Sequence, residues 1–215
     1  MNVITTILRD YAVIGKSIKL LKRSRSCVEN NWNQLEDYIA KSCKLISEEE
    51  FDSAFLNKKM FDHYPETISR SLLIDSFSGK WRSQPFGCQN PPDFIGFELL
   101  NDKMYVFYIE CKSGKSDRAT WNCTLPNPKA YAIYLFFNNG TQKLSVCSGI
   151  DLITKKEHQN LCDIMPIIRK QHEKINTDAS GWNLYLRPKW TPTKKHPHNV
   201  YHIDEYIKKI TNVSS

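Results

Sequence analysis

Residues 91–112 read PPDFIGFELLNDKMYVFYIECK, and the predicted sheet is built around them. Two runs rich in aromatic and β-branched residues, 94–100 and 105–110, have the composition of β-strands. Between them lies Asn101-Asp102, a pair of residues that favours a tight turn. The stretch therefore predicts an antiparallel hairpin closed by a two-residue loop.

The open end of this predicted hairpin is polar. With a two-residue loop, Leu100 faces Lys103, and counting back along both strands places Asp93 opposite Glu110. Opposed residues share a face, and strand alternation puts Lys112 on that face too. A three-residue loop would instead place Asp93 and Glu110 on opposite faces. The convergence of two carboxylates and one amine thus depends on the length of the loop.

Such a group favours a particular chemistry. Two carboxylates a few ångströms apart repel one another, so they take up a shared proton or a divalent cation. Oxygen ligands of this kind suit Mg²⁺, which can polarise a phosphoryl oxygen and lower the pKa of a bound water. The ammonium of Lys112 would stabilise charge on phosphorus or orient the attacking water. The alternative is a solvated strand end, where a Glu-x-Lys sequence is common without any catalytic role.

Pro92-Asp93 and Glu110-Cys111-Lys112 resemble the PD-(D/E)xK nuclease signature. The helical lead-in and the Ser/Lys-rich segment after the lysine resemble type II restriction endonucleases of that superfamily, over residues 60–137. The resemblance implies an α/β fold with a restriction-endonuclease-like core, a mixed central β-sheet flanked by helices. It also implies Asp93 and Glu110 as Mg²⁺ ligands, the backbone carbonyl of Cys111 as a further ligand, and Lys112 as the catalytic lysine.

A further acidic residue is implied by the same resemblance. In that family a helix before the aspartate-bearing strand often supplies it, and Glu66 fits best by position, with Asp62 and Asp75 as alternatives. A first-turn glutamate favoured by the helix dipole explains Glu66 equally well.

The rest of the chain is consistent with one nuclease domain, 1–215. We expect residues 1–80 to be mainly helical, 81–150 to form the catalytic sheet core, and 151–215 to add a helix and C-terminal DNA-contacting elements. Helical spacing runs over 4–14, and Ser47 with Glu50 has the form of a capping box.

Shorter elements are predicted around these. Pro65 suits the first turn of a helix that stops at Gly79. We also expect a strand at 131–137, a helix from 151 to about 176 that Pro166 interrupts, a strand at 182–187 and a helix at 203–210.

Composition and charge narrow the class of protein. The 215 residues are 40% hydrophobic and 25% charged, as in ordinary globular proteins, and the net charge of +7 favours polyanionic partners. The longest apolar run, 130–137, is too short to span a bilayer. Seven cysteines without a Cys-x-x-Cys pair indicate reduced thiols, and Arg9 and Asp10 precede any apolar region that a signal peptide needs. We therefore expect a cytoplasmic protein without a membrane segment.

Several polar and aromatic residues could contact DNA. They lie after the lysine, before the aspartate and near the C-terminal end: Lys115, Arg118, Trp121, Asn122, Arg82, Gln84, Arg187 and Lys189. For Trp121, a contact with DNA and a place in the core are both open. Ser113-Gly-Lys-Ser lacks the first glycine of a phosphate loop, since position 109 is Ile, so we expect no nucleotide cofactor.

The resulting hypothesis is a Mg²⁺-dependent, sequence-specific endonuclease of double-stranded DNA that leaves 5′-phosphates. A symmetric site is most simply read by a homodimer. A junction-resolving or repair nuclease remains open within the class, and a non-catalytic nucleic-acid-binding protein remains open outside it.

Overall fold

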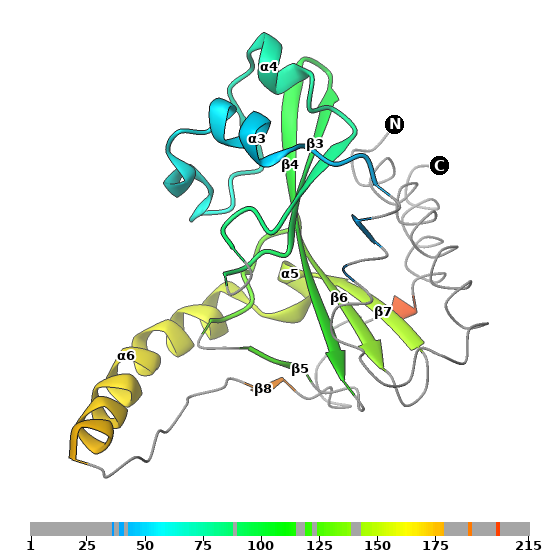
Figure 1. Ribbon diagram of the computed structural model, residues 1–215. Helices are drawn as coiled ribbons and strands as arrows, with labels where there is room; N and C mark the ends of the chain where they lie inside the picture. The colour runs from blue at the N-terminus through cyan, green and yellow to red at the C-terminus, as the bar shows by residue number, and fades with distance from the viewer. Residues whose placement is uncertain are drawn as a thin grey trace, which may run out of the picture.

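The computed structural model describes residues 36, 39–40, 43–87, 90–114, 119–121, 124–138, 143–178, 189–190 and 201–202. Within these ranges seven strands form one mixed sheet, in the order β2-β3-β4-β6-β7-β9, with β1 beside β4 (Figure 1). The α/β class with a mixed central sheet, expected from the sequence, is confirmed.

The elements have the following bounds. The strands of the main sheet are β1 (Thr67–Ile68), β2 (Lys80–Ser83), β3 (Phe94–Leu100), β4 (Lys103–Gly114), β6 (Ala132–Asn138), β7 (Lys143–Ser148) and β9 (Tyr201–His202). A separate pair consists of β5 (Ala119–Thr120) and β8 (Lys189–Trp190). The helices are α3 (Glu48–Ala54), the 3₁₀-helix η2 (Lys58–Phe61), α4 (Leu72–Asp75), α5 (Gly149–Leu152) and α6 (Lys155–Asp178).

The β3–β4 hairpin has the predicted register. Leu100 pairs with Lys103, and the ladder continues to Phe94 opposite Ile109. The two loop residues, Asn101 and Asp102, have φ values of 48° and 58°. A type I′ turn needs positive φ at both central residues, and its twist matches that of the strands. The two-residue loop is therefore confirmed.

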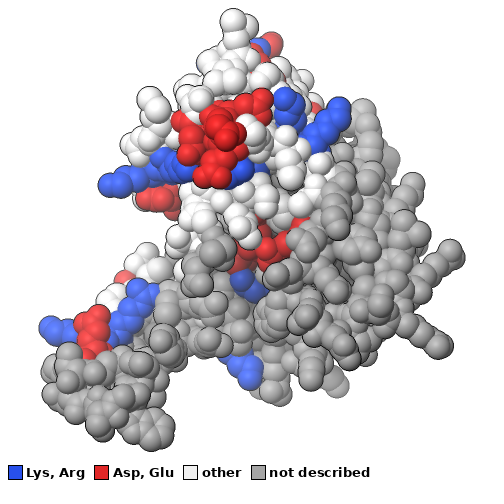
Figure 2. Space-filling view, in the orientation of Figure 1, with Lys and Arg blue, Asp and Glu red and all other residues white. Residues whose placement is uncertain are grey.

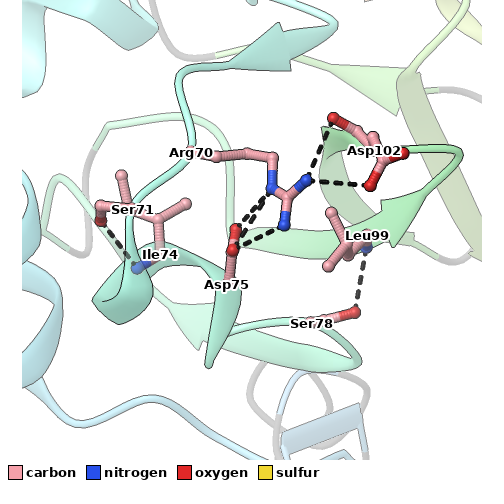
Figure 3. A network of polar contacts seen from close by, with 7 residues as sticks. All are labelled: Arg70, Ser71, Ile74, Asp75, Ser78, Leu99 and Asp102. Carbon is pink, nitrogen blue, oxygen red and sulfur yellow. Dashed lines mark hydrogen bonds and ion pairs between the residues drawn. The ribbon is translucent and has the colours of Figure 1, made fainter.

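A polar network holds the turn of the hairpin against α4 (Figure 3). The Arg70 guanidinium donates to both carboxylate oxygens of Asp75 and to Asp102 Oδ1, the latter at 3.1 Å. The Leu99 amide donates to the Ser78 hydroxyl oxygen at 2.9 Å. These contacts fix the closed end of the hairpin, and they place Asp75 at that end.

The long strand β4 connects two parts of the sheet. Its first residues pair with β1 and its later ones with β6, which lies parallel to it with Glu110 opposite Tyr134. In Figure 1, α3 and α4 lie near the turn end of the hairpin, whereas β6 and β7 lie beside the far end of β4. Tyr108 and Ile109 therefore have paired strands on both sides, β3 and β6.

Two hydrophobic clusters occupy one face of this sheet. The hairpin cluster joins strand residues such as Ile95 and Tyr108 to phenylalanines of the preceding helices and turns, Phe51, Phe55, Phe61 and Phe77. The β6 cluster contains Trp121, Ala132, Tyr134, Cys147 and Leu152. Strand alternation puts Asp93, Glu110 and Lys112 on the same face. The polar group thus lies in the row between the two clusters.

Some local predictions are confirmed and others are wrong. The capping box at Ser47 is present, with the Glu50 amide 3.1 Å from Ser47 Oγ. No helix runs from Pro65, because the Glu66 carbonyl accepts a hydrogen bond from the Val106 amide and the chain pairs with β4 as β1. Helix α6 continues through Pro166 instead of being interrupted there.

Other elements were not anticipated or are not described. Strands β1 and β2 lie in or border the part of the chain that we expected to be mainly helical, and β7 was not predicted. The expected elements at 4–14, 182–187 and 203–210 lie outside the described residues. None of the helices in the described ranges is long and apolar enough to cross a bilayer.

Candidate active site

Asp93 lies at the open end of the hairpin, one residue before β3. Its backbone oxygen accepts a hydrogen bond from the Gln84 amide at 2.7 Å. Its side-chain Oδ2 accepts one from the Cys111 amide at 2.5 Å. Extending the hairpin register by one residue places Asp93 opposite Glu110. The backbone of both strands therefore holds this carboxylate against the peptide that joins Glu110 to Cys111.

Glu110 is the buried member of the pair. The residue is 8% exposed, and Lys112 Nζ donates to its Oε1. The other oxygen, Oε2, is buried and has no hydrogen-bond partner in the described part of the chain. A buried oxygen without a donor costs free energy. One acceptor of Glu110 is therefore available to a cation or a donor from outside the chain.

Both carboxyl groups have raised pKa values. Burial raises the pKa of Glu110 to about 7 against the opposing effect of the Lys112 ammonium, and the Asp93 charge adds to the rise. Burial also raises the pKa of Asp93, while the Cys111 amide and Lys112 act in the opposite direction. A divalent cation would favour the ionised form of both groups.

Lys112 connects the carboxylates to the β6 cluster. Its ammonium binds Glu110 and lies 5.9 Å from the centre of the Trp121 ring, within the range of a cation–π interaction. Trp121 is 2% exposed and packs against Tyr134. The structure thus places Trp121 in the core, the second of the two positions left open by the sequence, and its ring forms a wall behind Lys112.

Sequence reasoning missed two residues near this group. The Glu36 charge raises the pKa of both Glu110 and Cys111. Tyr64 packs against both hydrophobic clusters. Its pKa is raised mainly by burial, and the charges of Glu110 and Asp93 add to the rise. Tyr64 also has a φ of 49°, a left-handed value that is unusual for a bulky residue. No local pattern marks either residue, since only the tertiary fold brings them to the hairpin.

The structure does not bring the three acidic residues suggested by position to the carboxylate pair. Glu66 is exposed, and its backbone lies level with Val106, four residues or about 13 Å along β4 from Glu110. Asp62 is exposed at the C-cap of η2. Asp75 is bound to Arg70 near the hairpin turn. Glu36 is the acidic residue whose charge acts on Glu110.

The residues proposed for DNA contact are distributed as follows. Arg82 lies in β2 and forms an ion pair with Glu48 at 3.2 Å, and Gln84 is exposed just beyond that strand. Lys189 is exposed in β8. Lys115, Arg118, Asn122 and Arg187 lie outside the described residues.

The chemistry of the donors fits Mg²⁺. Among the described residues, no three His, Cys, Asp or Glu side chains are grouped as metal ligands, so Asp93 and Glu110 form a pair. Mg²⁺ in proteins is often held by one or two carboxylates, with waters and substrate phosphates completing its shell. The unpartnered Oε2 of Glu110 supplies the free oxygen that such a site needs.

The raised pKa of Glu110 predicts how stability depends on pH. In metal-free buffer, the protonated Glu110 carboxyl contributes fully to the free energy of unfolding below pH 4.5, its usual pKa. This contribution is lost as the pH rises through about 7, because the carboxyl ionises more easily in the unfolded chain than in the folded protein. Glu110→Gln removes this loss. We expect the variant to be more stable than the wild type above pH about 7, with the difference shrinking at lower pH.

Urea unfolding over this pH range checks the prediction. The charges facing Glu110 are those of Asp93, Lys112 and Glu36, and all remain in the variant. Glu66→Gln is the matched control, since Glu66 is exposed, and its stability should follow the wild-type profile. A variant that loses stability as pH rises as steeply as the wild type would contradict the assignment to Glu110.

Comparisons of the chain with protein-family models, with curated proteins and with solved structures find no match. The class of the protein is therefore described from its fold and its candidate site. The protein is an α/β protein with a mixed sheet that carries two carboxylates and a lysine, Asp93, Glu110 and Lys112, between two hydrophobic clusters.

Proposed function

We propose that the protein is a Mg²⁺-dependent endonuclease that hydrolyses phosphodiester bonds of double-stranded DNA at a specific short sequence. The observation that carries the proposal is the group formed by Asp93, Glu110 and Lys112 at the open end of the hairpin. Its residue types and spacing resemble the PD-(D/E)xK signature of type II restriction endonucleases. A restriction-endonuclease-like core, 5′-phosphate products, a homodimer and a cytoplasmic location belong to the same proposal.

Asp93 and Glu110 would hold the metal ion together with the backbone carbonyl of Cys111. Bound Mg²⁺ would act as a Lewis acid on the phosphoryl oxygen and lower the pKa of a coordinated water. The Cys111 amide keeps the Asp93 carboxylate at the β4 backbone. Glu110, with its raised pKa, binds a cation in exchange for a proton near neutral pH.

Lys112 would act on the phosphate itself. Its ammonium lies beside the carboxylate pair and has the Trp121 ring near it, with 20% of the side chain exposed. A positive charge held in so sheltered a position stabilises negative charge that develops on the oxygens at phosphorus. Its Nζ protons can also orient the attacking water. Lys112 would thus be the side chain of the protein that stabilises negative charge in the transition state.

Glu36 would supply the additional acidic group that the resemblance first suggested at Glu66. Its charge reaches Glu110 without being part of a three-residue metal group in the described chain. A negative charge that acts on Glu110 would raise the affinity of the site for a divalent cation. Glu36→Gln is therefore expected to raise the Mg²⁺ concentration needed for half-maximal cleavage, whereas Glu66→Gln leaves it unchanged, as a titration of cleavage rate with Mg²⁺ would measure.

The test of the proposal is cleavage of plasmid and linear duplex DNA. We expect the wild-type protein to give discrete fragments with Mg²⁺ and none with EDTA. Lys112→Met keeps the length of the side chain, removes its charge and is expected to slow cleavage by about 10²–10³-fold. The matched control is Lys103→Met, an exposed position at the turn end of β4, which should cut at the wild-type rate.

The results also separate the alternatives. Binding without cleavage, unchanged in the variants, would favour a non-catalytic nucleic-acid-binding protein, for which the net charge of +7 suffices. Cleavage of branched or damaged duplexes alone would favour a junction-resolving or repair nuclease. Cleavage that persists in Lys112→Met would contradict the site.

A further inference from the structure

A groove lies beside the candidate active site, between α3, η2 and the chain that follows β2. Its volume is about 620 Å³, and its lining includes Glu48, Lys58, Arg82, Gln84 and Phe86. Pockets of 300–1,000 Å³ are typical of small-molecule sites, so a single base fits this volume. Nothing in the assignment of Asp93, Glu110 and Lys112 uses this groove.

The groove offers both hydrogen-bond donors and acceptors. Arg82 Nη2 lies 3.2 Å from Glu48 Oε2, while Arg82 Nε is buried and has no partner among the described residues. The Glu48 side chain is 70% exposed, so its carboxylate keeps free acceptor positions. Figure 2 shows acidic and basic side chains next to one another over α3. The surface around the groove is thus mixed in charge.

The position of the groove relates it to the carboxylate pair. Arg82 pairs with Ile95 in the sheet, and the backbone amide of Gln84 donates to the backbone carbonyl of Asp93 at 2.7 Å. Because opposed residues share a face, Arg82 lies on the face that carries Asp93. Neighbouring strands are about 4.8 Å apart. When the phosphate of one nucleotide contacts Asp93 and Glu110, the bases of the adjacent nucleotides can therefore reach the groove.

We infer that this groove binds one nucleobase next to the cleaved bond and that Arg82 and Gln84 read the edge of that base. The inference rests on the proposed function. Both cations of the groove are held by carboxylates, Arg82 by Glu48 and Lys58 by Asp52, which weakens their attraction for a phosphate. A base edge instead presents donors and acceptors that match Glu48, Arg82 and Gln84. Phe86, half-buried with its ring 6.0 Å from that of Phe61, adds an apolar wall for the face of the base.

The test uses a pool of duplexes with randomised sequence. One portion is cut with Mg²⁺ and the ends are sequenced, and another is selected for binding with Ca²⁺. Gln84→Met keeps the side-chain length without the amide, and Arg82→Lys keeps the charge without the two-pronged donor. In both variants, the preference for one base at one position beside the cut is expected to fall about tenfold, while the base preferences at the other positions stay unchanged. Gln171→Met, on the exposed surface of α6, is the matched control.

The cleavage and binding selections distinguish failure of the base-binding inference from failure of the proposed nuclease function. An unchanged base preference in both variants overturns the inference, and so does a uniform weakening over all sequences, which indicates a phosphate contact. If the wild-type protein cuts nothing, the proposed function fails and the binding selection alone decides about the groove. If Arg82→Lys does not fold, Gln84→Met decides, because Gln84 is exposed.

Discussion

Replacing Asp93 by asparagine is expected to slow Mg²⁺-dependent cleavage by at least about a thousandfold, a loss of about 4 kcal/mol of transition-state stabilisation. Asparagine has the same shape, and its amide oxygen can still accept the hydrogen bond from the Cys111 amide. The variant therefore changes the charge at the site and leaves the local geometry in place. Single-turnover cleavage of a duplex that the wild type cuts measures the effect.

The same variant should fold at least as well as the wild type. Burial raises the pKa of Asp93, so the ionised carboxyl is less favourable in the folded protein than in the unfolded chain. Removing its charge also relieves the repulsion that Glu110 experiences. We expect a melting temperature in EDTA equal to or above that of the wild type and duplex binding in Ca²⁺ that persists. Wild-type cleavage by Asp93→Asn would exclude Asp93 from the site.

The geometry of the candidate site was predictable from the sequence where local rules decide it. The turn at Asn101 and Asp102 sets the register, and that register alone puts Asp93 opposite Glu110. Strand alternation then fixes the face of Lys112. Each step uses neighbours in sequence or residues related by a two-residue turn, so no knowledge of distant contacts was needed.

The remainder depends on contacts that the sequence does not display. Glu36 acts on Glu110 from a position far away in the chain. The segment after Tyr64 forms β1 because β4 offers it a free edge, which outweighs the helical signal at Pro65. Trp121 lies in the core because β6 and α5 surround it, and its flanking sequence alone suits a loop equally well. These features follow from tertiary packing.

Gly149→Ala is expected to destabilise the protein by about 3 kcal/mol or more, the largest effect that we expect on folding. Gly149 begins α5 directly after β7. A Cβ atom there would overlap the backbone oxygen of Asn127 and lie 2.8 Å from that of Lys129. Backbone atoms cannot turn aside as a flexible side chain can, so either segment 124–130 or the start of α5 has to shift.

Such a shift would also reach the candidate active site. The backbone amide of Asn127 donates to the Tyr134 hydroxyl oxygen at 2.5 Å, and Tyr134 packs against Trp121 behind Lys112. Urea unfolding at fixed pH measures the loss. Gly79→Ala is the control: a Cβ there meets nothing within 4 Å, and only its φ of 71° is unfavourable, at about 1–2 kcal/mol. Because overlap with the backbone costs more than an unfavourable φ, Gly149→Ala must be the less stable of the two. The reverse order would mean that segment 124–130 yields easily and does not support the wall behind Lys112.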